Sequence, residues 1–312
     1  MSSRLSAFRP ARTVQRLAPR SAACPLSARD LLAPATELGL LLPFVRAPSA
    51  HVARGALVAA KALGSALGLV LPSGGRADRW FAEVTAAADE LAAALPLVLA
   101  GEVAVAGEGA LAVERASAET WALVDAGLTH LALDAAAVAP ADRGRVLSEV
   151  AGPAVERGLG IEWIVSLEDA SGSAARAVAG LEALARRGFR PDLAGVRCPA
   201  PADEEEARAQ ADALARLALA LRGTPVMRRG PVTPALLAAL ARSPVRACED
   251  GGAAAERALG GGAPAAGQGE EAERAEARAF AETTDLVEGL AAAGSAAALA
   301  AAMLRRVEGR HP

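Results

Sequence analysis

Short apolar runs of strand length alternate with longer amphipathic stretches from Leu38 to about residue 258. This alternation restricts the fold most, because repeated strand–helix units form parallel sheets covered by helices. The runs predict eight strands, at Leu40–Val45, Leu67–Leu71, Leu97–Ala100, His130–Asp134, Ile161–Ser166, Leu193–Arg197, Pro225–Met227 and Val245–Cys248. Eight such units match a (β/α)8 TIM barrel better than a doubly wound sheet, which usually has fewer strands. We therefore predict an α/β fold of the TIM-barrel type.

The joints between the predicted elements carry the residues expected at helix ends. Apolar residues recur at intervals of three and four between the strands, which predicts helices there. Four glycines follow predicted helices and precede predicted strands, namely Gly39, Gly127, Gly158 and Gly188. Asp203 and Thr233 stand where an N-cap is expected, and Glu206 follows Asp203 at capping-box spacing. These signals support the same strand–helix repeat.

Segments outside the repeat divide the chain into four predicted parts. Residues 1–23 are rich in Arg and Ser, lack acids, and predict a disordered leader, although the same composition is typical of an organelle transit peptide. Residues 24–258 hold the barrel, with a helix over Ser27–Leu38 that would cap its bottom. Residues 259–269 (GGGAPAAGQG from Gly260) predict a flexible linker, and residues 270–312 a C-terminal helical hairpin.

Composition and charge exclude several classes of partner. The chain is 53% hydrophobic and 22% charged with a net charge of -3, so it can bury a full core but has no positive field for nucleic acid. The Ala-rich tail, Leu290–Leu304, is too weakly hydrophobic to predict a membrane span. The three cysteines are widely spaced and form no C-x-x-C pair. We expect a cytoplasmic protein without nucleic-acid or membrane partners. The C-terminal hairpin offers a surface for a homo-oligomer or another partner, or only covers apolar surface.

The carboxyl ends of the predicted strands are the expected place for chemistry, because TIM barrels gather their functional residues there. Two carboxylates at these ends, Glu102 and Asp134, are candidates for general acid/base catalysis. Six further residues are candidates for binding a small anionic substrate: Arg46, Ser49, Arg197, Arg228, Arg229 and Gly230. Guanidinium groups match carboxylate and phosphate oxygens bidentately. The same arginines could instead pair with the carboxylates and fix loops, and the sequence leaves both readings open.

Metal binding has little support in the sequence. The chain has three histidines, His51, His130 and His311, and none is paired at i,i+4 or H-x-H spacing. His130 opens a strand, at the bottom of the barrel, and is expected to be structural. His51 begins the helix after the first strand and is the better functional candidate. Cys198 follows Arg197, which could lower its pKa, although a buried inert thiol is the simpler expectation.

Several stretches resemble the class II, zinc-dependent ketose-bisphosphate aldolases, which act on fructose- and tagatose-bisphosphate. CPLSARDLL from Cys24 is similar to the opening "PLVSAKELL" of that family. DAGLTHLALDAA from Asp125 is similar to "DAGFTSVMIDGS", and ERGLGIEWIVSLED from Glu156 falls where the family reads "GVSVEAELG". TPVMRRGPVTPALLAAL from Thr224 falls where the family reads "PLVLHGGSGIPDEDI". The resemblance covers residues 24–258 and implies a TIM barrel with lyase activity in carbohydrate metabolism.

The positions that hold zinc in the family are changed. The family's strand-three "LDHG" carries the catalytic Asp and a zinc His, and Ala100 and Gly101 stand there, with Glu102 next. The His of "HGGSG" is replaced by Arg228 or Arg229, and no His occurs between Cys198 and Pro201, where the family's strand-six zinc His would fall. The resemblance therefore implies a divergent member without the zinc site, and we expect no cofactor. We expect a pseudoenzyme that acts as a binding or regulatory paralogue, alone or beside an aldolase-type partner.

The alternative is an enzyme with altered chemistry. It would be a metal-independent or carboxylate-metal lyase acting on a phosphorylated or carboxylated sugar-like substrate, with Glu102 or Asp134 as acid/base. Whether the chain is an enzyme is left open by the sequence. Charged strand ends favour this alternative, and the missing histidines favour the paralogue.

Overall fold

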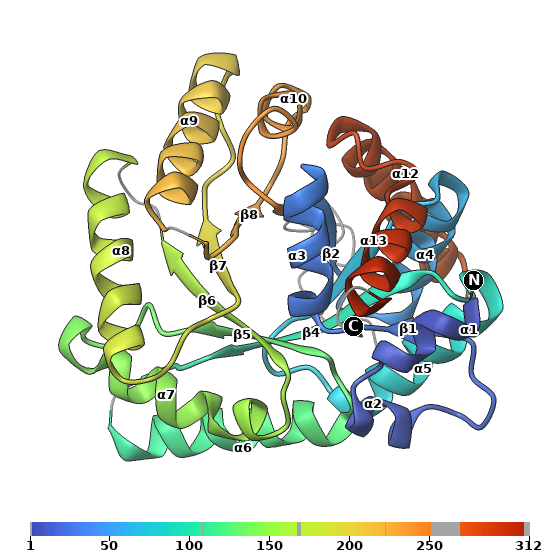
Figure 1. The fold of residues 1–312 in the computed structure, drawn as a ribbon, viewed down its shortest axis with the longest axis horizontal. Coiled ribbons are helices and arrows are strands. Elements are labelled where there is room, and N and C mark those ends of the chain that lie inside the picture. Colours follow the sequence, from blue (N-terminus) through green and yellow to red (C-terminus); the bar gives the residue numbers. More distant parts are fainter. Residues whose placement is uncertain (1, 108, 167–169, 222, 251–268, 309–312) are drawn as a thin grey trace.

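Eight parallel strands close into a barrel in the computed structural model, which describes residues 2–107, 109–166, 170–221, 223–250 and 269–308 (Figure 1). The strands are β2 (Leu42–Arg46), β3 (Leu67–Leu71), β4 (Pro96–Ala104), β5 (His130–Asp134), β6 (Gly160–Ser166), β7 (Leu193–Arg197), β8 (Val226–Gly230) and β9 (Ala247–Asp250). Each pairs with the next along the chain, and β9 pairs with β2. The predicted (β/α)8 barrel is confirmed.

Seven helices connect successive strands on the outside of the barrel. They are α4 (Ala50–Leu63), α5 (Ala77–Leu91), α6 (Ala110–Ala126), α7 (Pro140–Glu156), α8 (Ala170–Arg186), α9 (Glu204–Ala220) and α10 (Pro234–Leu240). The Asp203 side chain accepts from the Glu206 amide and Thr233 accepts from the Leu236 amide, as the capping pattern predicts. Gly127 ends α6 at φ 101°, a left-handed conformation that favours glycine. These caps therefore fix the beginnings of α9 and α10 and the end of α6.

The lower half of the barrel interior is apolar. It holds inward-facing residues of several strands: Leu42, Phe44, Val70, Val98, Leu193, Met227 and Ala247. Gly68 faces the Phe44 ring, and a Cβ at Gly68 would lie 2.1 Å from a ring carbon. A larger residue there would therefore collide with the one aromatic ring of this layer.

A helix closes the bottom of the barrel, as the sequence predicts. The short strand β1 (Cys24–Pro25) pairs with the first residues of β4 and leads into α3 (Ala28–Leu38). Leu31 and Leu32 of α3 belong to the same apolar cluster as Phe44. Helix α13 (Ser295–Glu308) packs against α3 and adds Leu299 and Met303 to that cluster. The bottom of the barrel is therefore buried under two layers of helix.

The N-terminal segment differs from the disordered leader that its composition predicts. It forms α1 (Ser2–Leu5), a 3-10 turn (Ser6–Phe8) and α2 (Ala11–Arg16). Thr13 is buried, and its hydroxyl donates to the Gly127 carbonyl at 2.8 Å. Arg12 pairs with Asp125 at 2.6 Å. These contacts with the end of α6 order the segment, and composition does not reveal them because they lie more than 100 residues away.

Two C-terminal helices are present as predicted, but they pack on different helices, α12 (Glu270–Gly289) on α4 and α13 on α3, rather than on each other as a hairpin would. Helix α12 lies along α4, as Figure 1 shows. The backbones approach so closely that a Cβ at Gly55 would lie 2.1 Å from the Glu276 carbonyl oxygen. Residues 259–268 of the predicted linker lie outside the described residues. No helix in the described part of the chain is long and apolar enough to cross a membrane.

Candidate functional site

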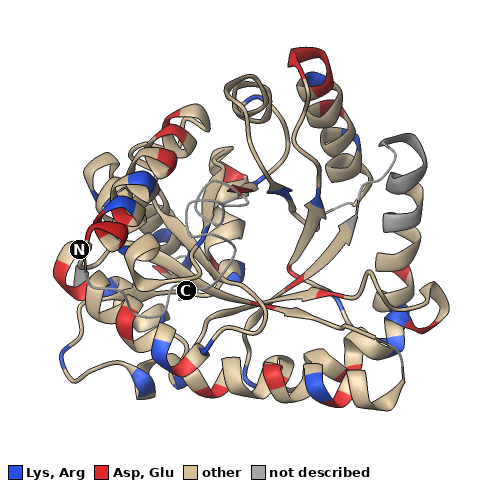
Figure 2. Cartoon of the chain, turned by 180° about the vertical axis from the view of Figure 1, so that it is seen from behind, with Lys and Arg blue, Asp and Glu red and all other residues tan. Residues whose placement is uncertain are grey.

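The upper half of the barrel interior carries ionisable side chains where the lower half carries apolar ones. Acidic and basic segments lie next to one another on the central strands (Figure 2). Eight residues, which we call the charged layer, are joined by ion pairs: Arg46, Glu102, His130, Asp134, Glu162, Arg197, Arg229 and Glu249. Seven of the eight strands contribute to it or border it, so the arrangement depends on barrel closure rather than on any one segment.

Arg229 on β8 is the centre of the charged layer. Its Nε and Nη2 donate to the two oxygens of Glu162 at 2.6 and 2.8 Å, which makes a bidentate pair. Both residues are fully buried. Gly195 makes room for the pair, because a Cβ there would lie 1.8 Å from Glu162 Oε1. Burial alone would raise the pKa of Glu162, but the charge and hydrogen bonds of Arg229 outweigh it and hold that pKa below its usual range.

Two more carboxylates share the remaining nitrogen of Arg229. Its Nη1 donates to Glu249 on β9 and lies 3.5 Å from Glu102 Oε2. Burial raises the pKa of Glu249, and the charges of Arg229 and Arg46 offset only part of that rise, since Glu102 and Glu162 lie nearby. Burial would lower the pKa of Arg229, but Glu162 and Glu249 hold it above its usual range. The pKa values of Glu162 and Glu249 are therefore shifted in opposite directions around one guanidinium group.

The upper edge of the charged layer consists of two further arginines. Arg197 on β7 bridges Glu102 at 3.0 Å and Asp134 at 2.9 Å, and its side chain is 45% exposed. Arg46 on β2 contacts Glu102 at 3.2 Å and lies 4.0 Å from Glu249 Oε1, with its side chain 21% exposed. Glu102, only 4% exposed, lies between the two guanidinium groups. The outermost groups of the layer are thus cationic and the carboxylates lie beneath them.

His130 forms the lower edge of the charged layer. It opens β5 and is fully buried, with Nε2 at 3.6 Å from Glu162 Oε2. This distance is too long for a hydrogen bond, and neither ring nitrogen has a hydrogen-bond partner among the described residues. His130 lies at the start of β5, where the charged layer meets the apolar lower half, and its structural role stays a prediction.

The other residues proposed for anion binding are placed apart from the charged layer. Arg228 lies on the opposite face of β8, fully buried, where its Nη2 donates to the Pro199 carbonyl at 3.1 Å. Gly230 ends β8 and its carbonyl accepts from Arg228 Nη1. Ser49 caps α4 by accepting from the Val52 amide at 3.4 Å. Of the six, Arg46 and Arg197 therefore combine a place in the layer with contact to solvent.

Neither cysteine near the strand ends is an activated thiol. Cys198 and Cys248 are free and buried beside Arg228. Burial raises the pKa of Cys198 to about 11 and that of Cys248 to about 12, and the Arg228 charge offsets only part of each rise. Both remain neutral at physiological pH, as expected for inert buried thiols.

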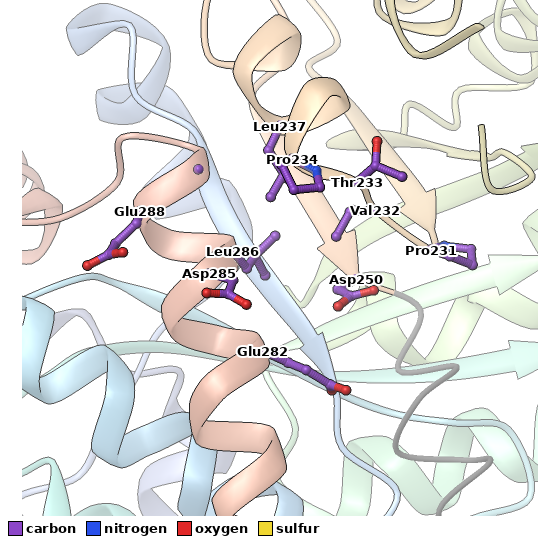
Figure 3. Close-up of a pocket in the computed structure, with 11 residues that line it drawn as sticks. Pro231, Val232, Thr233, Pro234, Leu237, Asp250, Glu282, Asp285, Leu286 and Glu288 are labelled. Atoms are coloured by element: carbon purple, nitrogen blue, oxygen red, sulfur yellow. The ribbon is translucent and has the colours of Figure 1, made fainter. Parts of the chain in front are cut away.

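A groove of about 530 Å³ lies beside the ends of β8 and β9, between α10 and α12. Figure 3 shows four carboxylate side chains around it, from Asp250, Glu282, Asp285 and Glu288. Its floor is apolar and includes Leu237 and Leu286. Because these carboxylates would repel phosphate or carboxylate groups, the groove does not suit an anionic ligand. The groove therefore differs in charge from the side of the mouth that Arg46 and Arg197 occupy.

Among the described residues, the side chains do not suit the zinc site of the family that the sequence resembles. Zinc sites in proteins use imidazole, thiolate and carboxylate donors in close groups. Across the described residues, no three His, Cys, Asp or Glu side chains are placed to hold a metal ion. His51 lies in the first turn of α4 and His130 at the barrel bottom, while His311 is outside the described residues. The carboxylates of the charged layer are already engaged by guanidinium groups.

The sequence places several of these residues just beyond the strand ends, at the mouth of the barrel, whereas the structure places them within the strands. Glu102, Arg229 and Glu249 follow predicted strands, but β4, β8 and β9 each continue past them. The alternation of side chains identifies them, because Arg229 and Glu249 each stand two residues after a buried inward residue, Met227 and Ala247. The sequence prediction ends each strand before its first charged residue, and the alternation is therefore missed.

A (β/α)8 barrel is the class that this fold defines, and comparison with solved structures agrees. A scan against family models and a search of curated proteins return no match. Among solved structures, the YdjI aldolase from Escherichia coli K12 superposes with a TM-score of 0.58 at 14% identity, over 86% of this chain and 98% of that one.

Two further solved structures show the same fold. A Coccidioides immitis protein named as a fructose-1,6-biphosphate aldolase gives a TM-score of 0.57 at 14% identity, over 86% of this chain and 96% of that one. A Sinorhizobium meliloti protein named as a tagatose 6 phosphate kinase gives 0.54 at 15% identity, over 84% and 87%. These structures confirm the TIM-barrel fold that the resemblance to class II aldolases implies. At 14–15% identity they show the fold alone, so the activity has to be argued from the side chains of this protein.

Proposed function

We propose that this protein is a divergent aldolase-like barrel without zinc-dependent aldolase activity, and that it acts as a binding or regulatory paralogue. One observation carries the proposal: the place where a TIM barrel holds its reacting groups is filled by the charged layer, whose carboxylates pair with arginines. A catalytic carboxylate must exchange protons with a substrate, and one held by guanidinium groups beneath the surface is poorly placed to do so.

The ligand that fits this proposal is a small anionic metabolite. It would meet the guanidinium groups of Arg46 and Arg197 first, since they form the exposed edge of the layer. A cytoplasmic location and a homo-oligomer, or association with an aldolase-type partner, belong to the same proposal. The exposed face of α13 and α12 is where such an assembly would be sought, by measuring molar mass in solution with light scattering.

The test is aldol cleavage of fructose- and tagatose-bisphosphate by the purified protein, with and without added Zn²⁺ or Co²⁺, together with its metal content. We expect no turnover and no stoichiometric zinc. A His51→Ala variant is a matched control, because a zinc site that used His51 would lose metal on this substitution. Turnover accompanied by stoichiometric metal that His51→Ala removes would overturn the proposal.

A second candidate function is a lyase that needs no zinc and uses Glu102 or Asp134 as acid/base. The observation in its favour is that Asp134 lies under Arg197, where an anionic substrate could displace the guanidinium group from the carboxylate. Asp134→Asn would abolish such an activity while leaving ligand binding in place. Under the paralogue proposal, the same variant changes neither, because no turnover exists to lose.

A further inference from the structure

The exposed face and the buried part of the charged layer differ in sign. Arg197 and Arg46 form the face, and Glu102 and Glu249 lie buried beneath them. Helix α4 begins within four residues of Arg46, so the positive end of its dipole adds to the same side of the mouth. A ligand arriving from solvent therefore meets positive charge, although negative charge lies below.

Carboxylates outnumber guanidinium groups in the charged layer. Its four carboxylates are Glu102, Asp134, Glu162 and Glu249, and its three guanidinium groups are Arg46, Arg197 and Arg229. Glu162 takes two nitrogens of Arg229, and Arg197 is divided between Asp134 and Glu102. Glu249 Oε2 accepts a hydrogen bond from Arg229 Nη1, and its other oxygen lies 4.0 Å from Arg46 Nη1. Arg46 is therefore the positive charge that faces Glu249 Oε1.

Groups facing Glu249 come from four other strands. Arg46 of β2 and Arg229 of β8 are attractive, whereas Glu102 of β4 and Glu162 of β6 are repulsive. An oxyanion bound to Arg46 would compete with Glu249 for that guanidinium group and add negative charge above it. Both changes disfavour the ionised form of a buried carboxyl group, whose pKa burial already raises. A proton on Glu249 removes this conflict without moving any strand.

We propose that a small oxyanion binds across Arg46 and Arg197, and that Glu249 takes up one proton when it does. This inference rests on the proposed function, because it assigns the ligand chemistry and its regulation to the same mouth. The ligand class is defined by a phosphate, sulfate or carboxylate group that two guanidinium groups can hold. Binding is thereby linked to pH, and it strengthens as the pH falls.

Titration calorimetry with sulfate tests the inference, because the charge of sulfate does not change between pH 5.5 and 8. Repeating the titration in two buffers of different ionisation enthalpy gives the number of protons taken up. We expect uptake of up to one proton per sulfate bound, and an affinity that rises as the pH falls, by at most about tenfold per pH unit. Parallel titrations with inorganic phosphate and malonate show which oxyanion the mouth prefers.

Two variants test oxyanion binding and proton uptake separately. Arg197→Gln is expected to weaken sulfate binding at least tenfold, since it removes one of the two guanidinium groups. Glu249→Gln, which mimics the protonated carboxyl group, is expected to bind sulfate more tightly at pH 8 and to take up no proton. Binding by the parent protein without proton uptake overturns the inference even if a variant does not fold, and so does absence of binding by all three oxyanions. Aldol cleavage, measured separately, decides the proposed function.

Discussion

The two halves of the barrel interior are built on opposite principles. Below, side chains such as Leu42, Phe44 and Met227 fill the space with apolar surface. Above, Arg229, Glu162 and their neighbours fill it with charge. Apolar packing is non-directional and tolerates substitutions of similar volume, whereas a buried ion pair is stable only while every partner is present. The upper half is therefore the part that a single substitution disrupts most.

The largest expected effect is the loss of the central cation. Arg229→Met removes the group that neutralises Glu162 and Glu249, and leaves two fully buried carboxylates without their main partner. Breaking a buried pair by removing one partner costs about 3–5 kcal/mol. We expect the free energy of unfolding, measured by urea denaturation at pH 7, to fall by that amount.

Neutralising the two carboxylates as well as removing Arg229 shows whether the loss of stability comes from unpaired charge or from lost side-chain volume. A variant that carries Arg229→Met together with Glu162→Gln and Glu249→Gln has fewer unpaired charges in the same space. It is expected to recover part of the lost stability, because neutral amides bury at lower cost than carboxylates. If the triple variant is less stable than Arg229→Met alone, the loss is one of packing, and the contrast between the two halves does not hold.

Phe44→Ala in the lower half gives the next largest effect. The ring is fully buried and lies against the space at Gly68, so its removal leaves a cavity that costs about 3 kcal/mol. Because no charge is involved, the loss should not change with pH or salt. A loss that varied between pH 5 and 8 would show that the lower half is coupled to the charged layer.

Sequence reasoning recovers the lower half more completely than the upper half. The apolar run Leu67–Leu71 matches β3 residue for residue, because continuous apolar runs are the signature of strands buried on both faces. Glu102 and Glu249 are recognised as candidates but are placed beyond their strands, because a charged residue is usually taken to end a buried run. A charged side chain is stable inside a buried strand only when a partner of opposite charge reaches it from another strand. A single sequence does not show which strands lie together.

Gly195 illustrates the same limit. In the sequence it is an isolated glycine in a strand, with no evident role. In the barrel, its missing side chain is the space that the pair of Glu162 and Arg229 occupies. The reason for the glycine lies about 30 residues away in both directions, and only barrel closure brings the three residues together.

The pH dependence of stability is expected to show two opposite contributions. Glu162 has a pKa below the ordinary 4.5, so its contribution is present above pH 4.5 and is lost as the pH falls through the lower value in the folded state. Glu249 has a pKa above 4.5, so its contribution is present below pH 4.5 and is lost as the pH rises through the higher folded value. Stability is therefore expected to decline at low pH because of Glu162 and at higher pH because of Glu249.

Two matched substitutions separate these contributions. Glu249→Gln is expected to flatten the decline on the alkaline side and to change stability less than Phe44→Ala does. Glu162→Gln is expected to lower stability at every pH above 4.5, because it removes the bidentate partner of Arg229. Thermal denaturation from pH 4 to 9 measures both. Similar profiles for the two variants would contradict the assignment of opposite pKa shifts.

The smallest effect on stability is expected at the exposed edge of the charged layer. Arg197 pairs with Glu102 and Asp134, as Arg229 pairs with its own carboxylates, but its side chain is 45% exposed. Exposed ion pairs contribute about 0–1 kcal/mol, since solvent screens the charges. Arg197→Gln is therefore expected to lower the free energy of unfolding by less than about 1 kcal/mol.

The stability of Arg197→Gln shows whether Arg197 is available to bind a ligand. An arginine that contributes little to stability yet is held in place by two carboxylates is available to a ligand, whereas Arg229 is committed to the fold. Comparing urea denaturation of Arg197→Gln and Arg229→Met measures that difference in one protein. Equal losses would mean that Arg197 is as structural as Arg229, and the mouth would then lack the exposed cationic edge on which oxyanion binding depends.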